Sequence, residues 1–129
     1  MANENEDVVK RGYELFSAGD MDGLKQMFTP DFVHHVAGAS QVAGDHSGPD
    51  AAIALYGKYF ELSGGTLKVD LKSLKSDDDQ VAATHQATAE RGGNKLDQPV
   101  VLTFTVKDGK MSRLEEQPSD QAAFDEFWG

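Results

Sequence analysis

The stretch Phe32-Val33-His34-His35-Val36-Ala37-Gly38 follows two short helical patterns, precedes a Gly-rich loop and carries two of the four histidines. We expect it to form a strand. Because successive side chains of a strand point to opposite faces, His34 and His35 lie on opposite sides of the sheet that the strand joins. One of them can face a cavity but not both, and a one-residue change of register exchanges them.

Helical patterns flank this strand on both sides. Apolar spacing predicts a helix over about 5–18 and a second short helix that begins at Asp20 and stops at Thr29-Pro30. Residues 38–48 have the composition of a loop. A third helix is expected over about 49–62, with Pro49 in its first turn.

From Leu67 the apolar period changes from about 3.6 to 2, which predicts strands instead of helices. Alternation continues over 81–90, 100–106 and 111–117, and a short helix capped by Ser119 ends the chain. Helices first and antiparallel strands later indicate an α+β fold, with three N-terminal helices packed on a curved antiparallel sheet. Such a sheet leaves a hollow in which a small-molecule pocket is expected.

Composition narrows the classes of partner. The 129 residues suit a single domain spanning 1–129. A formal net charge of −10 disfavours nucleic acid and anionic membranes. The absence of cysteine excludes disulfides, and no signal peptide or membrane span is recognisable, so a cytoplasmic protein is expected. Histidine spacing does not favour a metal site, and phosphate-binding and dinucleotide motifs are missing, so no cofactor is expected.

Four strings together resemble the nuclear transport factor 2-like superfamily, in its SnoaL-like and ketosteroid-isomerase-like part. They are SAGDMDGL at 17–24, VHHVAG at 33–38, AGDHSG at 43–48 and VKDGK at 106–110. The chain is similar to a bacterial group of mostly unassigned function within that superfamily. The resemblance covers essentially the whole chain and implies a cone with a deep pocket, commonly paired into homodimers through the sheet.

The resemblance also suggests roles for particular residues. The general-base aspartate of ketosteroid isomerases corresponds to His35, so we expect His35 to face the pocket and His34 to face away. The oxyanion tyrosine falls at Gly12, beside Tyr13, and the protonated aspartate falls near Val101. Because all three positions differ, ordinary steroid-isomerase chemistry is not expected. A polyketide-cyclase acid/base residue would fall near Glu115 or Glu116.

We therefore expect a pocket for a small apolar organic molecule, with His35 as the catalytic residue. Seven further residues are expected to bind the ligand: Tyr13, Phe16, Tyr56, Tyr59, Phe60, His85 and Glu115. The chemistry predicted for an enzyme is cofactor-free isomerisation, cyclisation or dehydration of a carbonyl compound. The alternatives are a protein that binds its ligand without changing it, and a dimeric interaction module whose cone is filled by its own side chains.

Overall fold

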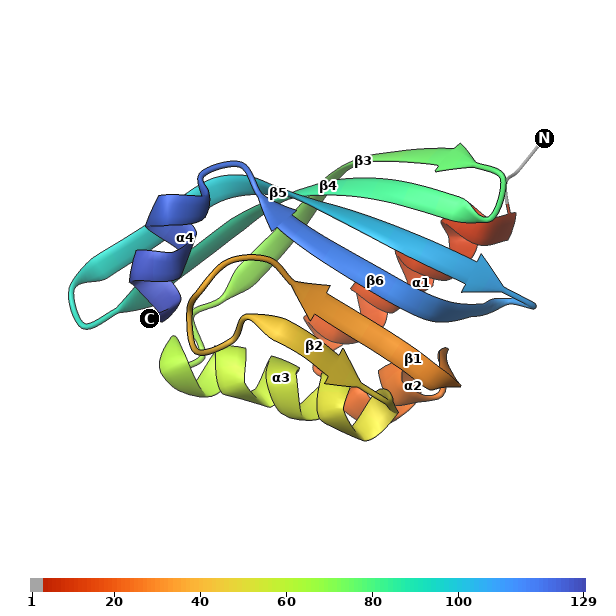
Figure 1. Ribbon diagram of the computed structural model, residues 1–129, viewed down its shortest axis with the longest axis horizontal. Helices are drawn as coiled ribbons and strands as arrows, with labels where there is room; N and C mark the ends of the chain where they lie inside the picture. Colours follow the sequence, from red (N-terminus) through yellow and green to blue (C-terminus); the bar gives the residue numbers. More distant parts are fainter. Residues whose placement is uncertain (1–3) are drawn as a thin grey trace.

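The computed structural model describes residues 4–129 and has an α+β architecture, as expected (Figure 1). Along the chain the elements are α1 (Glu4–Ala18), α2 (Met21–Lys25), β1 (Phe28–Val36), β2 (Gly44–Ser47), α3 (Pro49–Leu62), β3 (Lys68–Asp77), β4 (Gln80–Arg91), β5 (Asn94–Lys107), β6 (Lys110–Pro118) and α4 (Gln121–Trp128).

The strands form one curved, unclosed sheet in the order β2-β1-β6-β5-β4-β3. Neighbouring strands are antiparallel except for β1 and β6, which are parallel. In Figure 1, α1 runs behind the strands, α3 lies beside β1 and β2, and α4 covers one end of the long β4 and β5. The concave side of the sheet is therefore enclosed by helices.

Several local signals of the sequence act as expected. The Asp20 carboxylate caps α2 by accepting from the Gly23 amide at 2.9 Å. Pro49 occupies the first turn of α3, and Gly19 ends α1 with a φ of 74°. The helix limits agree with the expected 5–18 and 49–62 to within one residue.

Three local predictions are wrong. The second helix ends at Lys25 and not at Thr29-Pro30, because these two residues already belong to β1. The expected loop over 38–48 contains β2, whose polar residues have no apolar alternation but pair with β1. The cap of α4 is Asp120, not Ser119, because the Asp120 carboxylate accepts from the Ala123 amide at 3.1 Å.

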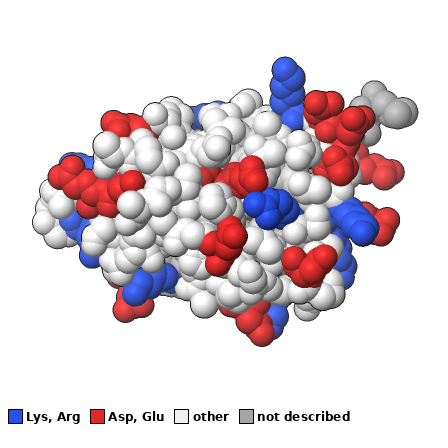
Figure 2. Space-filling view, in the orientation of Figure 1, with Lys and Arg blue, Asp and Glu red and all other residues white. Residues whose placement is uncertain are grey.

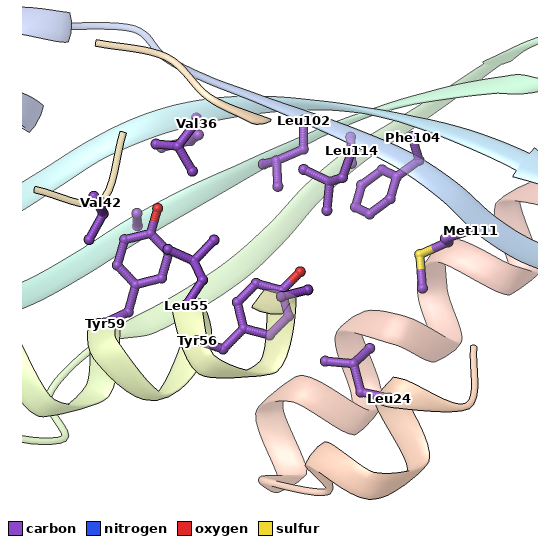
Figure 3. Close-up of a cluster of buried hydrophobic side chains, with 14 of the residues drawn as sticks. Leu24, Val36, Val42, Leu55, Tyr56, Tyr59, Leu102, Phe104, Met111 and Leu114 are labelled. Carbon is purple, nitrogen blue, oxygen red and sulfur yellow. The ribbon is translucent and has the colours of Figure 1, made fainter. Parts of the chain in front are cut away.

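The core lies between the helices and the concave face of the sheet. Figure 3 shows the rings of Tyr56 and Tyr59 extending from α3 toward the strands that carry Leu102 and Leu114. Both rings are 5% exposed. The two hydroxyl groups are thus placed inside the molecule, where each needs a hydrogen-bond partner.

Close packing at Gly38 fixes α4 against the end of β1. Gly38 has a φ of 106°, and a Cβ there would collide with the side chains of Gln121 and Asp125. The Gln121 amide donates to the Ala37 carbonyl at 3.2 Å and to the Asp125 carboxylate at 3.0 Å. This contact fixes the position of α4, the helix that carries Trp128.

Among residues 4–129, no helix is both long and apolar enough to cross a membrane. Figure 2 shows acidic side chains scattered over one face, with fewer basic side chains and uncharged surface between them.

Candidate functional site

A cavity of about 80 Å³ lies between the sheet and the helices. Most of its wall is apolar. The lining residues are Val9, Gly12, Tyr13, Phe16, Leu24, Phe28, His34, Tyr56, Tyr59, Leu67, Val69, His85, Ala87, Leu96, Leu102, Phe104, Met111, Leu114, Glu116, Phe124 and Trp128. The wall contains one carboxylate and neither lysine nor arginine.

The polar part of the wall is a chain of four side chains from β1, β6 and α3. His34 Nε2 lies 2.8 Å from Glu116 Oε1, and His34 Nδ1 lies 2.8 Å from the Tyr56 hydroxyl. The Tyr59 hydroxyl donates to Glu116 Oε2 at 3.2 Å. Both ring nitrogens and both carboxylate oxygens therefore have partners. His34 and Glu116 are 2% and 7% exposed, so this network lies away from bulk water.

The parallel pairing of β1 with β6 brings the histidine and the carboxylate together. His34 stands opposite Leu114 in the register, and Glu116 lies two residues further along β6 on the same face. Tyr56 and Tyr59 are three residues apart on α3, so their rings share one side of that helix. Three elements, β1, β6 and α3, thus contribute to one hydrogen-bonded chain.

A second polar pair joins α1 to β4. The Tyr13 hydroxyl lies 2.7 Å from His85 Nδ1, and the two rings meet edge to face. Burial lowers the pKa of His85, although the charge of Glu116 acts in the opposite direction. Burial, assisted by the charge of Glu116, raises the pKa of Tyr13. Both groups are therefore neutral at pH 7.

The other two tyrosines respond to the same environment. Burial is the largest cause of the raised pKa of Tyr56 and of Tyr59, and the charge of Glu116 adds to it. All three phenols on the wall thus keep their hydrogens at neutral pH and act as donors.

Trp128 contributes a hydrogen-bond donor that has no partner. It is 1% exposed, it lines the cavity, and its indole Nε1 has no acceptor among residues 4–129. Its neighbours are the aromatic rings of Tyr59, Phe124 and Phe127. A buried donor without a partner costs about 1–3 kcal/mol, so this group is exceptional in a well-packed protein.

Five of the expected site residues line the cavity, and three do not. Tyr13, Phe16, Tyr56, Tyr59 and His85 are part of the wall. Phe60, His35 and Glu115 lie outside it. Phe60 stacks on Phe16 from the outer side, with ring centroids 5.3 Å apart.

The expected orientation of the two histidines is wrong. His34 faces the cavity, whereas His35 points to the outer face, where its Nδ1 lies 2.6 Å from Asp45 Oδ1. The physical reason is strand alternation: Phe32 and Val36 are buried and share a face with His34.

Glu115 is displaced from the cavity for the same reason. It lies opposite His35 in the register and pairs with Arg113 on the outer face at 3.1 Å. Glu116 occupies the inner face, where Leu114 is also buried. Of the two carboxylates that the resemblance suggested, Glu116 is the one in the cavity wall.

Phe124 and Trp128 of α4 are among the cavity residues that sequence reasoning missed. Their helical spacing places them on one face of a terminal helix, but nothing local shows where that helix docks. Within the described part of the chain, no group of three or more metal-ligating side chains is present.

The sequence matches the model of the SnoaL-like domain over residues 9–114. An uncharacterised protein of Mycobacterium tuberculosis is 37% identical over 123 residues, covering 95% of this chain and 94% of that protein. Bal32a, from a soil-derived mobile gene cassette, is 39% identical with a TM-score of 0.94, over 98% of this chain and 97% of its own.

More distant structures share the fold alone. An NTF2-like protein from Burkholderia xenovorans is 22% identical, with a TM-score of 0.83 over 98% of this chain and 96% of its own. A candidate SnoaL-like polyketide cyclase from Jannaschia sp. is 24% identical. Its TM-score is 0.73, over 94% of this chain and 89% of its own. The resemblance found in the sequence is thereby confirmed: this chain belongs to the SnoaL-like domain family.

Proposed function

We propose that the cavity binds a small, largely apolar organic molecule and that the protein catalyses cofactor-free proton transfer on a carbonyl compound. Isomerisation, cyclisation and dehydration belong to this class of reaction. The observation that carries the proposal is the hydrogen-bonded pair of His34 and Glu116 in the wall of a mostly apolar cavity.

Burying a carboxylate and an imidazole is expensive unless their hydrogen bonds compensate for it. A purely structural wall would be built more cheaply from the leucine, valine and phenylalanine side chains that surround the pair. Acid/base catalysis requires polar groups of this kind in a place from which water is excluded. The role that the resemblance suggested for His35 therefore passes to His34 and Glu116.

The pair moves a proton without a cofactor. Glu116 takes a proton from the carbon next to the substrate carbonyl, and the electron pair of the broken C–H bond moves toward the carbonyl oxygen. A hydrogen-bond donor on the wall stabilises the negative oxygen that results. Glu116 then returns the proton to another carbon of the substrate, which completes an isomerisation. His34 holds the carboxylate in position from Oε1, and Tyr59 holds it from Oε2.

A second candidate function is binding without turnover. The observation in its favour is that both ring nitrogens of His34 and both carboxylate oxygens of Glu116 already have partners within the chain. A protein of this kind would release its ligand unchanged.

We also propose that two chains associate through the outer face of the sheet. On this face β4 and β5 carry short uncharged side chains, among them Ala82, Thr84 and Thr103. Val101 is 39% exposed there and is the one exposed large hydrophobic residue in the described chain. Val101→Lys should convert a dimer into a monomer, as measured by light scattering; a monomeric wild type would contradict the proposal.

The test of function begins with a thermal-shift screen of steroid, terpenoid, polyketide and aromatic carbonyl compounds. A ligand at about 100 times its dissociation constant adds roughly 2.7 kcal/mol, which raises the melting temperature by several degrees. Each hit is then incubated in deuterium oxide, and exchange or rearrangement is followed by NMR.

Two variants separate the candidate functions. Glu116→Gln should lower turnover about 100-fold or more while the compound still binds. His35→Gln, one residue from the site but on the outer face, is the matched control and should leave turnover unchanged. A compound that binds and returns unaltered, without deuterium, supports binding alone. No hit from the whole panel, together with an unchanged melting temperature, overturns both functions in favour of a filled cone.

A further inference from the structure

The hydrogen bonds of the cavity wall decide which polar atoms remain free for a ligand. Tyr59 donates to Glu116 Oε2, and His34 Nε2 donates to Glu116 Oε1. The Tyr56 hydroxyl then donates to His34 Nδ1, the remaining acceptor of that ring. The hydroxyl hydrogens of Tyr56 and Tyr59 and the ring hydrogen of His34 are thus engaged within the protein.

The pair of Tyr13 and His85 leaves one donor free. Since both groups are neutral and a phenol is the stronger acid, we assign the shared hydrogen to the Tyr13 hydroxyl, which donates to His85 Nδ1. The ring hydrogen of His85 is then on Nε2. This nitrogen has no hydrogen bond to any residue between 4 and 129.

Trp128 supplies the other free donor. Its Nε1 is buried without an acceptor, and the rings of Tyr59 and Phe127 that pack on the indole offer none. Gln41 holds the backbone of this residue, because its side chain donates to the main-chain carbonyl of Trp128 at 2.9 Å. Ring packing therefore holds the indole, and the backbone hydrogen bond anchors the end of α4 that carries it.

The charges of the wall restrict the ligand further. Glu116 is the one carboxylate in the lining, and no lysine or arginine side chain lines the cavity to balance an acidic ligand. An anion would be desolvated there next to a carboxylate, which is strongly unfavourable. The rest of the wall is aliphatic or aromatic and suits a flat ring system.

We infer that the cavity takes an uncharged, flat dicarbonyl compound whose two oxygens accept hydrogen bonds from Trp128 Nε1 and His85 Nε2. This inference rests on the proposed function, because it names the substrate class of the same cavity. It also accounts for the donor that the acid/base mechanism requires. Both oxygens are held without breaking any hydrogen bond of the His34–Glu116 chain.

Three compounds of similar shape test the inference by calorimetric titration. They are 1,4-naphthoquinone with two carbonyl groups, 1-tetralone with one, and naphthalene with none. Each lost hydrogen bond should weaken binding by about fivefold to tenfold, so affinity should fall in that order. The anion 1-naphthoate should not bind. The protein has no cysteine with which a quinone would react.

Variants assign the two donors. Trp128→Phe keeps an aromatic ring but removes the N–H group, and it should weaken naphthoquinone about tenfold while leaving naphthalene unchanged. Phe124→Leu, on the same helix and the same wall, is the matched control and should affect all three compounds equally. Tyr13→Phe combined with His85→Phe removes the second donor without leaving a lone hydroxyl, and it should again weaken naphthoquinone selectively.

The outcomes separate this inference from the proposed function. If other compounds of the screen bind or turn over but naphthoquinone binds no better than naphthalene, the inference is wrong and the proposed function stands. Equal losses for all three compounds in Trp128→Phe would also overturn it, because the indole would then act only by packing. A selective loss in both donor variants supports it.

Discussion

Two histidine–carboxylate pairs lie one residue apart along β1, on opposite faces of the same sheet. His34 lies 2.8 Å from Glu116 on the inner face, with side chains 3% and 9% exposed. His35 lies 2.6 Å from Asp45 on the outer face, with side chains 41% and 60% exposed. The distances are nearly the same, so the surroundings decide what each pair contributes.

Water competes for every hydrogen bond of the outer pair. If either partner of that pair is removed, the other is resolvated at little cost. The inner pair has no such substitute: removing one partner leaves a polar group facing an apolar cavity. The comparison shows that chemical type and distance do not by themselves identify a functional pair. Burial and the second partners, Tyr56 and Tyr59, distinguish the inner pair.

The largest effect is expected when the inner pair is broken. His34→Leu removes the Nε2 donor from Glu116 and leaves the Tyr56 hydroxyl without its acceptor. We expect the free energy of unfolding to fall by about 3 kcal/mol or more. Urea denaturation followed by circular dichroism measures this, with His35→Leu as the control. Equal losses in the two variants would contradict the difference between the faces.

The sequence contains enough information to predict that His34 and Glu116 face the cavity. Phe32 and Val36 share a face with His34, and Leu114 shares one with Glu116. Alternation alone places His34 and Glu116 inside, because large apolar side chains mark the dry face of a strand. The correspondence with a family position suggested His35 instead, and for this pair of residues the periodicity was the better guide.

Other features could not be derived from the sequence. The order of elements follows from local signals such as the Asp20 cap and the change of period at Leu67. Two contacts join segments that lie about 80 residues or more apart in the sequence. One is the parallel pairing of β1 with β6, and the other is the docking of α4, which brings Trp128 to the cavity. Local propensity contains no information on such contacts, which depend on how the whole chain packs.

A double-mutant cycle sharpens the comparison. The coupling between His34→Leu and Glu116→Leu should be about 1.5–3 kcal/mol, because each partner is desolvated and the bond involves a carboxylate. The coupling between His35→Leu and Asp45→Leu should be about 0.2–1 kcal/mol. Both cycles use urea denaturation of all variants in the same buffer. A coupling at the outer pair as large as that at the inner pair would refute the argument from burial.

The pH dependence of stability depends on a second buried histidine, His85. Burial lowers the pKa of His85 in the folded state, so below about pH 6.5 the unfolded chain takes up a proton that the folded chain does not. The stability that His85 contributes is therefore present above pH 6.5 and is lost as the pH falls through its folded pKa.

The groups that act on His85 are the Tyr13 hydroxyl and the charge of Glu116. Urea denaturation between pH 7.5 and 5 should show a smaller loss of stability for the combined variant Tyr13→Phe and His85→Phe than for the wild type. The same slope in both proteins would mean that His85 is not held neutral by burial.

The smallest effect is expected at the outer pair. His35→Ala removes a hydrogen bond to Asp45 that water replaces, so the free energy of unfolding should change by less than about 1 kcal/mol. High salt should reduce even this difference, since it screens exposed charges. If His35→Ala instead abolishes turnover while His34→Ala does not, the active face of the sheet is the outer one, and the assignment of the site to the cavity is wrong.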